Sequence, residues 1–503
     1  MKICAPEEER EVLMSIRSFK TLAGLGLTAS VFAGAAHAAS LQEAATLASA
    51  ASVKTLEFAG AGHWRQFGQA PVPGGDWPKF DVSAYSAAID FDKVAERVLV
   101  TRSQTPDGRA RPAPVEQKLE WFIVGDKAWN VAPPQGAAPG AAPVATPAPA
   151  AVDERVAEIW ATPQGFLKAA LANNAKSETA GSGVEVSFAI GARRFVGAIG
   201  ADNHVSAIKT WIDTPVLGDT LIETHFAGYK DFGGLHFPAE IHRSEGGHEI
   251  LHVNVASAKA NGAVDIAVPA NVASAPAPVV TVASEKLADG VFYLTGGTHH
   301  SLAVEEKDHV VLIEAPLSEE RSIALIQKIG EIIPGKPVKY VVNSHVHFDH
   351  SGGLRTFVDA GATIVTQDIS KAYYEKAWAA PHTLRPDRLA ASKKAAKFET
   401  YEHKHALGDL HAIEIHHIAG SGHSDDLALV YLPKEKLVIE ADAYTPAAVG
   451  APPPATPNPF SVNLYDNIQK LHLDVERIAG LHGRVATIDE LRAAIGLKKA
   501  AAN

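Results

Sequence analysis

Four potential metal-binding side chains fall within six consecutive positions of this chain. They follow the pattern His-x-His-x-Asp-His and are His345, His347, Asp349 and His350. Imidazole nitrogens and carboxylate oxygens at this density are donors that suit zinc and similar first-row divalent metals. The pattern therefore predicts a metal site; the alternative is a run of surface histidines.

The apolar run before this motif predicts the element that holds it. Residues 338–342 read Val-Lys-Tyr-Val-Val, which is typical of a strand, so the motif lies on the loop at its end. In an extended stretch, residues two apart point the same way, and His345 and His347 can bind one cation together. A turn after them would aim Asp349 and His350 at a second point nearby.

Three further donors follow other apolar runs. His423 lies in a Gly-flanked loop after a predicted strand, Asp442 ends the run 437–441, and His482 lies in a loop between a predicted helix and a short strand. A sheet can hold short polar donors rigidly at the ends of its strands. With the first four, these residues predict a site for two metal ions.

The order of these motifs resembles that of the metallo-β-lactamase superfamily, and the resemblance covers roughly residues 279–497. It implies a four-layer αββα sandwich with the site on one edge. It also implies which residues bind each ion. The implied ligands are His345, His347 and His423 for the first ion, Asp349, His350 and His482 for the second, and Asp442 as the bridge between them. Asp349 is further implied as the catalytic residue that orients or deprotonates the attacking hydroxide.

Two departures from the antibiotic-degrading members are visible. Asp442 stands where many of those enzymes have cysteine, and a bridging aspartate instead resembles glyoxalase II and lactonases. Glu314, in Leu-Ile-Glu-Ala-Pro, takes the place of an aspartate that supports the site from behind.

The expected chemistry is metal-dependent hydrolysis. Two divalent ions about 3.5–4 Å apart can hold a bridging hydroxide, which would attack a carbonyl-type bond. The expected cofactor is Zn2+, two per chain, although His/Asp sets also accept iron or manganese. The expected partner is a small ester, lactone, thioester or amide, β-lactams included.

Strands that alternate with helices over the last 220 or so residues predict an α/β sandwich for residues 279–503. The predicted strands are 291–295, 301–304, 310–314, 338–342, 363–366, 413–418, 427–432 and 436–441. The predicted helices are 323–333, 354–360, a stretch from 370, 468–478 and 488–495.

Residues 39–267 have a mostly antiparallel β pattern with one or two helices over 152–175, which predicts a curved sheet or half-barrel. The predicted strands are 85–90, 97–101, 120–124, 184–189, 205–213, 220–229 and 249–255. The Pro/Ala-rich stretch 132–151 is expected to be a mobile, partly extended loop, and the similar stretch 268–278 a domain linker.

Composition and the first residues bear on location. The net charge of −11, without a basic patch, argues against nucleic acid and anionic membranes as partners. A positive segment from Met14, an apolar stretch and Ala-His-Ala at 36–38 predict a signal peptide over 1–38 and a periplasmic or secreted protein. The single cysteine, Cys4, lies in that leader, and no other segment reaches transmembrane length.

Several alternatives stay open. His299 and His300 are candidates for the substrate pocket or for the surface, and Asp425 and Asp426 could compete as ligands. The chain could also be a periplasmic carrier whose N-terminal sheet holds an apolar ligand beside a structural metal domain. Iron-based redox chemistry is disfavoured because no flavin-binding partner domain is evident.

Overall fold

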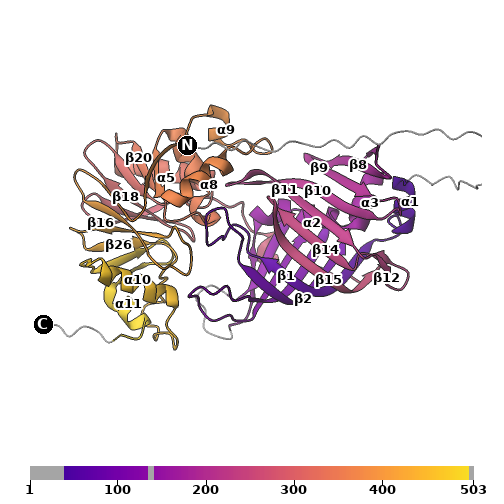
Figure 1. Ribbon diagram of the computed structural model, residues 1–503, viewed down its shortest axis with the longest axis horizontal. Helices are drawn as coiled ribbons and strands as arrows, with labels where there is room; N and C mark the ends of the chain where they lie inside the picture. Colours follow the sequence, from indigo (N-terminus) through magenta and orange to yellow (C-terminus); the bar gives the residue numbers. More distant parts are fainter. Residues whose placement is uncertain (1–38, 134–140, 498–503) are drawn as a thin grey trace, which may run out of the picture. The chain divides into compact units, whose positions relative to one another are not determined.

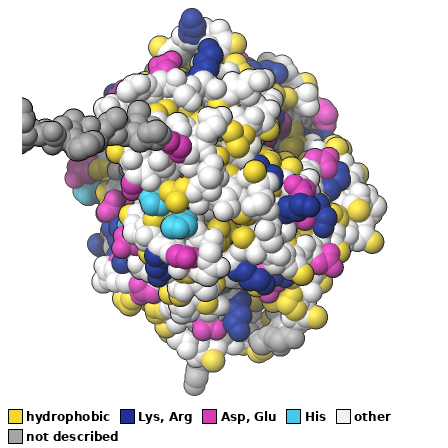
Figure 2. All heavy atoms as spheres, turned by 90° about the vertical axis from the view of Figure 1, so that its right-hand side faces the viewer, with side chains coloured by type: hydrophobic (Ala, Val, Ile, Leu, Met, Phe, Trp, Pro, Cys, Tyr) yellow, Lys and Arg dark blue, Asp and Glu magenta, His cyan; other side chains and the backbone are white. Residues whose placement is uncertain are grey.

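The computed structural model describes residues 39–133 and 141–497 (Figure 1). The predicted signal peptide at 1–38 lies outside them. Within the described part, no helix is long and apolar enough to cross a membrane. The face of the molecule drawn in Figure 2 mixes basic and acidic side chains, and neither kind forms a continuous patch on it.

A 13-stranded sheet of antiparallel neighbours dominates the N-terminal part. Its strands, in spatial order, are β6 (Val144–Pro147), β5 (Lys127–Ala132), β4 (Gln117–Val124), β3 (Ala95–Gln104), β2 (Lys79–Asp90), β1 (Thr55–Arg65), β15 (His248–Ala260), β14 (Glu240–Glu245), β11 (Gly218–Ala227), β10 (Val205–Thr214), β9 (Arg193–Ile199), β8 (Gly183–Ile190) and β7 (Lys176–Ala180). Each of the seven predicted strands overlaps one of these. A separate two-stranded ribbon joins β12 (Lys230–Asp231) to β13 (His236–Phe237).

This sheet curves around a helix, as the antiparallel β pattern with helices over 152–175 predicts. The helices beside it are α1 (Leu41–Leu47), α2 (Val152–Trp160) and α3 (Pro163–Ala172), and Figure 1 shows α2 and α3 against the sheet. Helix α2 contacts β3, β4 and β5 and also β10. In a flat sheet β4 and β10 would lie about 34 Å apart, far more than the roughly 10–12 Å width of a helix, so the sheet must bend.

The two Pro/Ala-rich stretches carry more structure than expected. Within 132–151, β6 pairs with β5, and a 3-10 turn, η1 (Pro149–Ala151), leads into α2. The expectation of a loop throughout this stretch was therefore wrong at its C-terminal end, because an edge strand tolerates proline. In 268–278, α4 (Ala270–Ala273) contacts β5 and β6, and the Asn271 side chain donates to the Ala145 carbonyl at 2.8 Å.

The C-terminal part contains two sheets. The first, with seven strands, comprises β16 (Ala283–Ala288), β17 (Val291–Thr295), β18 (Ser301–Glu305), β19 (Val310–Ile313), β20 (Val338–Val342), β21 (Thr363–Gln367) and β22 (Lys397–Tyr401). The second, with six, comprises β23 (Lys404–Leu407), β24 (Ile413–His417), β25 (Ala428–Leu432), β26 (Leu437–Glu440), β27 (Arg477–Gly480) and β28 (Val485–Thr487).

Apolar side chains on both faces of the strands show that the two sheets pack face to face. Along β18 and β19, Leu302 and Val311 pack into a core shared with the second sheet, whereas Ala303 and Leu312 face a core shared with helices. Successive side chains of a strand point to opposite faces, so a strand buried on both faces is apolar throughout. The layers are therefore helix, sheet, sheet, helix, which confirms the predicted αββα sandwich.

Helices cover the two outer faces. On the first sheet lie α5 (Glu319–Ile332), α7 (Leu354–Ala360), α8 (Asp368–Trp378) and α9 (Arg388–Ser392), and on the second α10 (Pro459–Lys470) and α11 (Ile488–Ala494). The prediction of a helix over 468–478 was wrong. The helix begins at Pro459 after the Asn458 cap and ends at Lys470, and only the last residues of the predicted span, 477 and 478, belong to β27.

Four strands end at one edge of the sandwich. Strands β24 and β26 both run antiparallel to β25, so they point the same way, and β27 runs parallel to β26. The segments that follow these strands, together with the segment after β20, bring the predicted ligands to one place. The short helix α6 (Phe348–Ser351) carries part of the first motif.

Candidate metal centre

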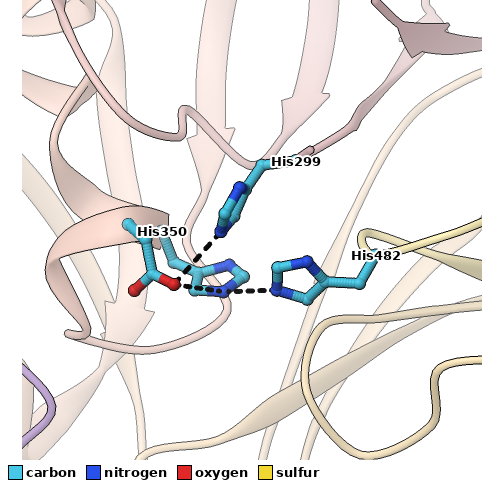
Figure 3. A group of neighbouring side chains, drawn as sticks. His299, His350 and His482 are labelled. Carbon is cyan, nitrogen blue, oxygen red and sulfur yellow. Dashed lines mark hydrogen bonds and ion pairs between the residues drawn. The ribbon is translucent and has the colours of Figure 1, made fainter. Parts of the chain in front are cut away.

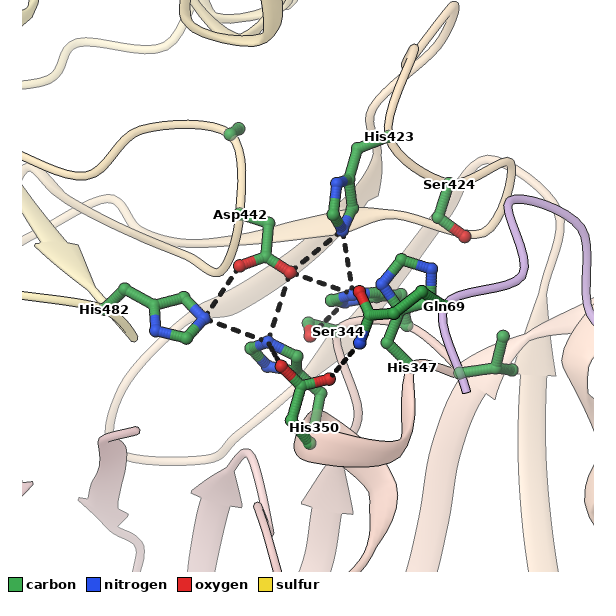
Figure 4. Close-up of polar contacts among 12 residues, drawn as sticks. Gln69, Ser344, His347, His350, His423, Ser424, Asp442 and His482 are labelled. Atoms are coloured by element: carbon green, nitrogen blue, oxygen red, sulfur yellow. Dashed lines mark hydrogen bonds and ion pairs between the residues drawn. The ribbon is translucent and has the colours of Figure 1, made fainter. Parts of the chain in front are cut away.

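Two adjoining groups of four side chains have donor atoms close enough to hold metal ions. In each group one donor atom from every residue lies within 4.8 Å of the others. The groups are His345, His347, His423 and Asp442, and His299, Asp349, His350 and His482. The structure thus brings together all seven residues that the sequence singled out and adds His299 to them. Figure 4 labels five of these residues, His347, His350, His423, Asp442 and His482.

Asp442 lies between the two groups. Its Oδ2 is 2.9 Å from Nε2 of His423 and 3.1 Å from Nε2 of both His345 and His350. Its Oδ1 is 2.7 Å from Nε2 of His482. One carboxylate therefore faces histidines from both groups, as a bridging ligand would.

The imidazole nitrogens face one another as ligands of a shared cation would. Nε2 of His345 is 3.3 Å from Nε2 of His423, and Nε2 of His350 is 3.1 Å from Nε2 of His482. Two nitrogen lone pairs in such proximity repel unless a proton or a cation lies between them. Imidazole and carboxylate donors are those of zinc sites, so the residues present fit two divalent metal ions.

Polar groups around the cluster fix the orientation of several rings. Nε2 of His347 donates to the carbonyl oxygen of Ala70 at 3.1 Å, and Nδ1 of His482 lies 3.3 Å from the carbonyl oxygen of Thr298. Nδ1 of His347 is buried and has no hydrogen-bond partner among the described residues. A ring held through one nitrogen keeps the lone pair of the other available to a metal.

Glu314 supports the cluster from behind, at the end of β19. Its fully buried carboxylate lies 3.3 Å from Nδ1 of His350 and accepts hydrogen bonds from Asn343, at 3.1 Å, and from the Ser344 hydroxyl. Its backbone has φ of +74°, a left-handed conformation that is energetically unfavourable for a residue other than glycine. The glutamate therefore takes the supporting place that the resemblance gave to an aspartate.

Asp349 is held by two side chains. Its Oδ1 accepts from Gln69 Nε2 at 2.8 Å, and its Oδ2 lies 3.1 Å from Nε2 of His299 (Figure 3 shows His299, His350 and His482). Burial alone would raise the pKa of Asp349. The bond from His299 and the charge of His350 outweigh burial and keep that pKa well below its usual range.

The electrostatics of the cluster favour positive charge. Burial opposes a charged His350, yet Asp442 and Glu314 raise its pKa well above the usual value. Burial likewise opposes ionisation of Asp442, but the surrounding histidines hold its pKa well below the usual value. Burial lowers the pKa of His347 and of His423 and so favours their neutral, ligating form.

The weaker candidates have other partners. Asp425 pairs with Arg109 at 2.6 Å, and Asp426 accepts from the Ser370 hydroxyl at 2.7 Å, so neither joins the ligand groups. His300 is buried, with Nε2 donating to the Gly483 carbonyl at 2.8 Å. The surface interpretation of His299 and His300 was therefore wrong for both.

Sequence reasoning missed the contribution of the segment after β1. Gln69 and Ala70 reach the cluster from that segment, 280 and 277 positions away from their partners Asp349 and His347. No spacing or motif in the sequence links such distant residues.

Comparison with known proteins agrees with this geometry. Residues 294–481 match the metallo-beta-lactamase superfamily. With the αββα layers and the His/Asp groups, that match places this segment in the superfamily. The C-terminal part of the chain therefore has a metallo-β-lactamase fold, preceded by a large antiparallel sheet.

Solved structures with some likeness include three metallo-β-lactamases, all 19% identical to this chain. They are a protein from Pontibacter korlensis (TM-score 0.34, 43% of this chain, 98% of that one), one from Hirschia baltica (0.32, 42% and 96%) and FIM-1 from Pseudomonas aeruginosa in its mono-zinc form (0.33, 43% and 95%). No curated protein matches the chain.

Proposed function

We propose that this chain is an exported, dinuclear zinc-dependent hydrolase of a small substrate with a carbonyl-type bond. The observation that carries the proposal is the double group of His and Asp donors around Asp442. His345, His347 and His423 would hold one ion and Asp349, His350 and His482 the other. Bound there, two such ions would supply an activated water and a Lewis acid for a substrate oxygen.

The chain's own residues would orient that chemistry. Asp349 is fixed on both oxygens, by Gln69 and by His299, and is the best-placed carboxylate to accept a hydrogen bond from the attacking water. Asp442 and Glu314 would keep the histidines in place through their contacts with the rings. A nucleophilic serine or cysteine would not be needed.

The bond hydrolysed belongs to one of four classes: ester, lactone, thioester or amide, β-lactams included. The names of the similar solved structures describe those proteins, and at these identities they do not choose among the four. A substrate panel covering all four classes, run with zinc-loaded protein, would identify the class.

Metal content and turnover test the proposal together. Purified protein should contain about two equivalents of zinc at this centre, and hydrolysis should disappear on chelation and return with zinc. His345→Ala and Asp349→Asn should each abolish turnover and lower the metal content. His403→Ala, in a side chain 80% exposed, is the matched control and should change neither. Folded protein that binds no metal at this centre would refute the proposal.

The carrier hypothesis has less support. The cavity between the N-terminal sheet and α2 has a volume of about 50 Å³ and is lined by Phe58, Tyr85, Glu158 and Arg243 among others. A second pocket, on strands β1, β2, β3 and β15, has a volume of about 340 Å³, and its lining includes Glu57, Arg97 and Lys259. Ligand pockets usually have volumes of about 300–1,000 Å³. The space under α2 would accept little more than a few waters. The second pocket is large enough for a small ligand, but charged side chains line both spaces, which disfavours an apolar ligand.

Export is proposed on the predicted signal peptide alone. Cleavage after Ala38 would leave a mature chain that begins at Ala39. Mass spectrometry of the N-terminus of protein from a native-like host would test this, and an uncleaved leader in the soluble cytoplasmic fraction would contradict it.

A further inference from the structure

Four histidines form a row across neighbouring strands of the N-terminal sheet, outside the centre described above. His225 on β11 pairs with His242 on β14, His242 pairs with His252 on β15, and His252 pairs with His63 on β1. Directly paired residues of antiparallel strands project from the same face, with Cβ atoms about 4.5–5.5 Å apart. We refer to these four residues as the histidine row.

The rings in the middle of the row are in contact. The centroids of His242 and His252 are 3.9 Å apart in a stacked arrangement, and those of His63 and His252 are 5.0 Å apart, edge to face. The sheet brings these rings together from positions almost 190 residues apart in the chain. A tight cross-strand cluster of imidazoles would repel itself if all were protonated, which favours the neutral form that can bind a metal ion.

A carboxylate completes the cluster at one end. Glu249 Oε2 lies 2.9 Å from Nε2 of His63, and its Oε1 lies 3.3 Å from Nδ1 of His242. The register of β14 and β15 shifts between Arg243 and Ser244, close to where Glu249 stands in the pairing. Glu249 thus lies against the histidine row, and its two oxygens face two of the rings.

One nitrogen of this cluster has no partner. Nε2 of His252 is buried and makes no hydrogen bond to any described residue. Buried polar atoms are nearly always satisfied, so this nitrogen has room in its bonding for a ligand that the protein atoms do not supply. The donor atoms of His63, Glu249 and His252 all lie within 4.8 Å of one another.

We propose that His63, His252 and Glu249 form a second, separate binding site for zinc or a similar first-row divalent metal. Two histidines and one glutamate are a known zinc ligand set that leaves a fourth position for water. Tetrahedral coordination at ordinary zinc–ligand lengths puts donors about 3.3 Å apart, so small side-chain rotations would close the site.

A neighbouring trio, Glu240, His242 and His252, is the poorer choice. It shares His252 with the first trio. Its other two side chains, Glu240 and His242, are 50% and 39% exposed. The corresponding side chains of the first trio, Glu249 and His63, are 38% and 20% exposed. The more buried trio loses less side-chain freedom on binding an ion and is better shielded from competing water.

A metal at this site would tie together two distant parts of the chain. Strand β1 and strand β15 are neighbours near the middle of the sheet, although they begin and end the segment that forms it. Cross-linking such distant residues lowers the entropy of the unfolded chain, and binding to the native state stabilises it by mass action. The expected role is structural, and it is independent of turnover at the C-terminal centre.

Metal counting on the full chain tests the site. Protein stripped with a chelator, reloaded with zinc and dialysed should hold one equivalent more than the His252→Ala variant treated identically. His225→Ala is the matched control, because His225 belongs to the same row but to neither trio. It should keep the wild-type metal content.

Glu249→Gln provides a second variant in case His252→Ala fails to fold, and it should also lose one equivalent. Zinc should raise the thermal unfolding midpoint of wild type and of His225→Ala more than that of either site variant. Equal metal content in wild type and both site variants would overturn the proposal. An equal loss in His225→Ala would overturn it too, because it would indicate unspecific binding to surface histidines.

Discussion

At the scale of single residues, the second nitrogen of each ring decides whether the first can bind a metal. His350 lies against Glu314 through Nδ1, and His347 donates to the Ala70 carbonyl through Nε2. The two rings therefore present different nitrogens to the centre. A histidine motif fixes which residues can ligate, but these neighbours fix the tautomer with which they do so.

Replacing Glu314 tests this support. Glu314→Gln keeps the size of the side chain but removes the negative charge behind His350, so its ring becomes a weaker and less fixed ligand. Loss of such a partner typically costs about 10–100-fold in metal affinity or activity. Chelator competition would measure the affinity. Glu306→Gln, another fully buried glutamate whose carboxylate accepts from the backbone of Asp409 and Leu410, is the control and should leave metal affinity unchanged.

The contact from Gln69 to Asp349 gives a second test at this scale. Gln69→Ala removes a hydrogen bond to a charged oxygen, which is worth about 1.5–3 kcal/mol, and we expect kcat to fall roughly tenfold or more. Steady-state kinetics would show the fall, while the metal content should change little. Gln42→Ala, in an exposed residue of α1, should have wild-type kinetics. Wild-type kcat in Gln69→Ala would show that Asp349 needs no help from the N-terminal part.

At the scale of elements, the segment after β1 and the short helix α6 form one unit. The Phe348 amide donates to the Gly68 carbonyl at 3.1 Å, and the rings of Phe67 and Phe348 meet edge to face at 5.2 Å. The N-terminal sheet therefore braces the helix that carries Asp349 and His350. The sequence-based view of two independent parts did not include this contact.

Gly68→Ala would disturb that brace. Gly68 has φ of +71°, and a Cβ there would lie 2.6 Å from the Phe348 ring, so the helix would have to move. Gly108→Ala is a matched control, since Gly108 has φ of +80° and nothing within 4 Å of an added Cβ. Both variants should lose roughly 1–2 kcal/mol through the left-handed backbone. Only Gly68→Ala should lose further stability and kcat. If urea unfolding and kinetics gave the same changes for both variants, the contact between Gly68 and Phe348 would not support the helix.

At the scale of the whole molecule, buried carboxylates in the N-terminal sheet make stability depend on pH. Burial, with repulsion from Glu154, raises the pKa of Glu245 to about 8. Burial and the charge of Glu158 raise the pKa of Glu96 well above its usual value. In the unfolded chain both groups titrate near 4.3, so between about pH 4.5 and pH 8 the native state holds more protons.

Stability should therefore be greatest at the acidic end of that window and fall as pH rises through it. The slope is about 1.4 kcal/mol per pH unit for each extra proton held by the native state. Urea unfolding at pH 5 and pH 8 would measure it. Glu245→Gln should reduce the difference between the two pH values, and Glu185→Gln, at an exposed position of β8, should not. An unchanged difference in Glu245→Gln would show that Glu245 is ionised throughout.

Much of the C-terminal sandwich was predictable because its strands are buried on both faces and read as apolar runs. Strand β1 was missed because its sequence, Thr-Leu-Glu-Phe-Ala-Gly-Ala-Gly-His-Trp-Arg, has glycines where a side chain would collide. A Cβ at Gly62 would lie 2.0 Å from the His252 carbonyl oxygen. Close backbone approach at a β-bulge requires these glycines. Because glycine is uncommon inside strands, the sequence did not predict a strand here.

By itself, the sequence determined which residues can bind a metal and in what order they occur along the chain, because spacing and strand ends are local properties. It gave His345, His347 and His350 together, and the sandwich that holds them. Only the tertiary structure decided that Gln69 and His299 hold Asp349, that the Ala70 carbonyl orients His347, and that His63 meets His252. Such contacts depend on the packing of strands that are far apart in the chain, and no local pattern records which distant strand will become a neighbour.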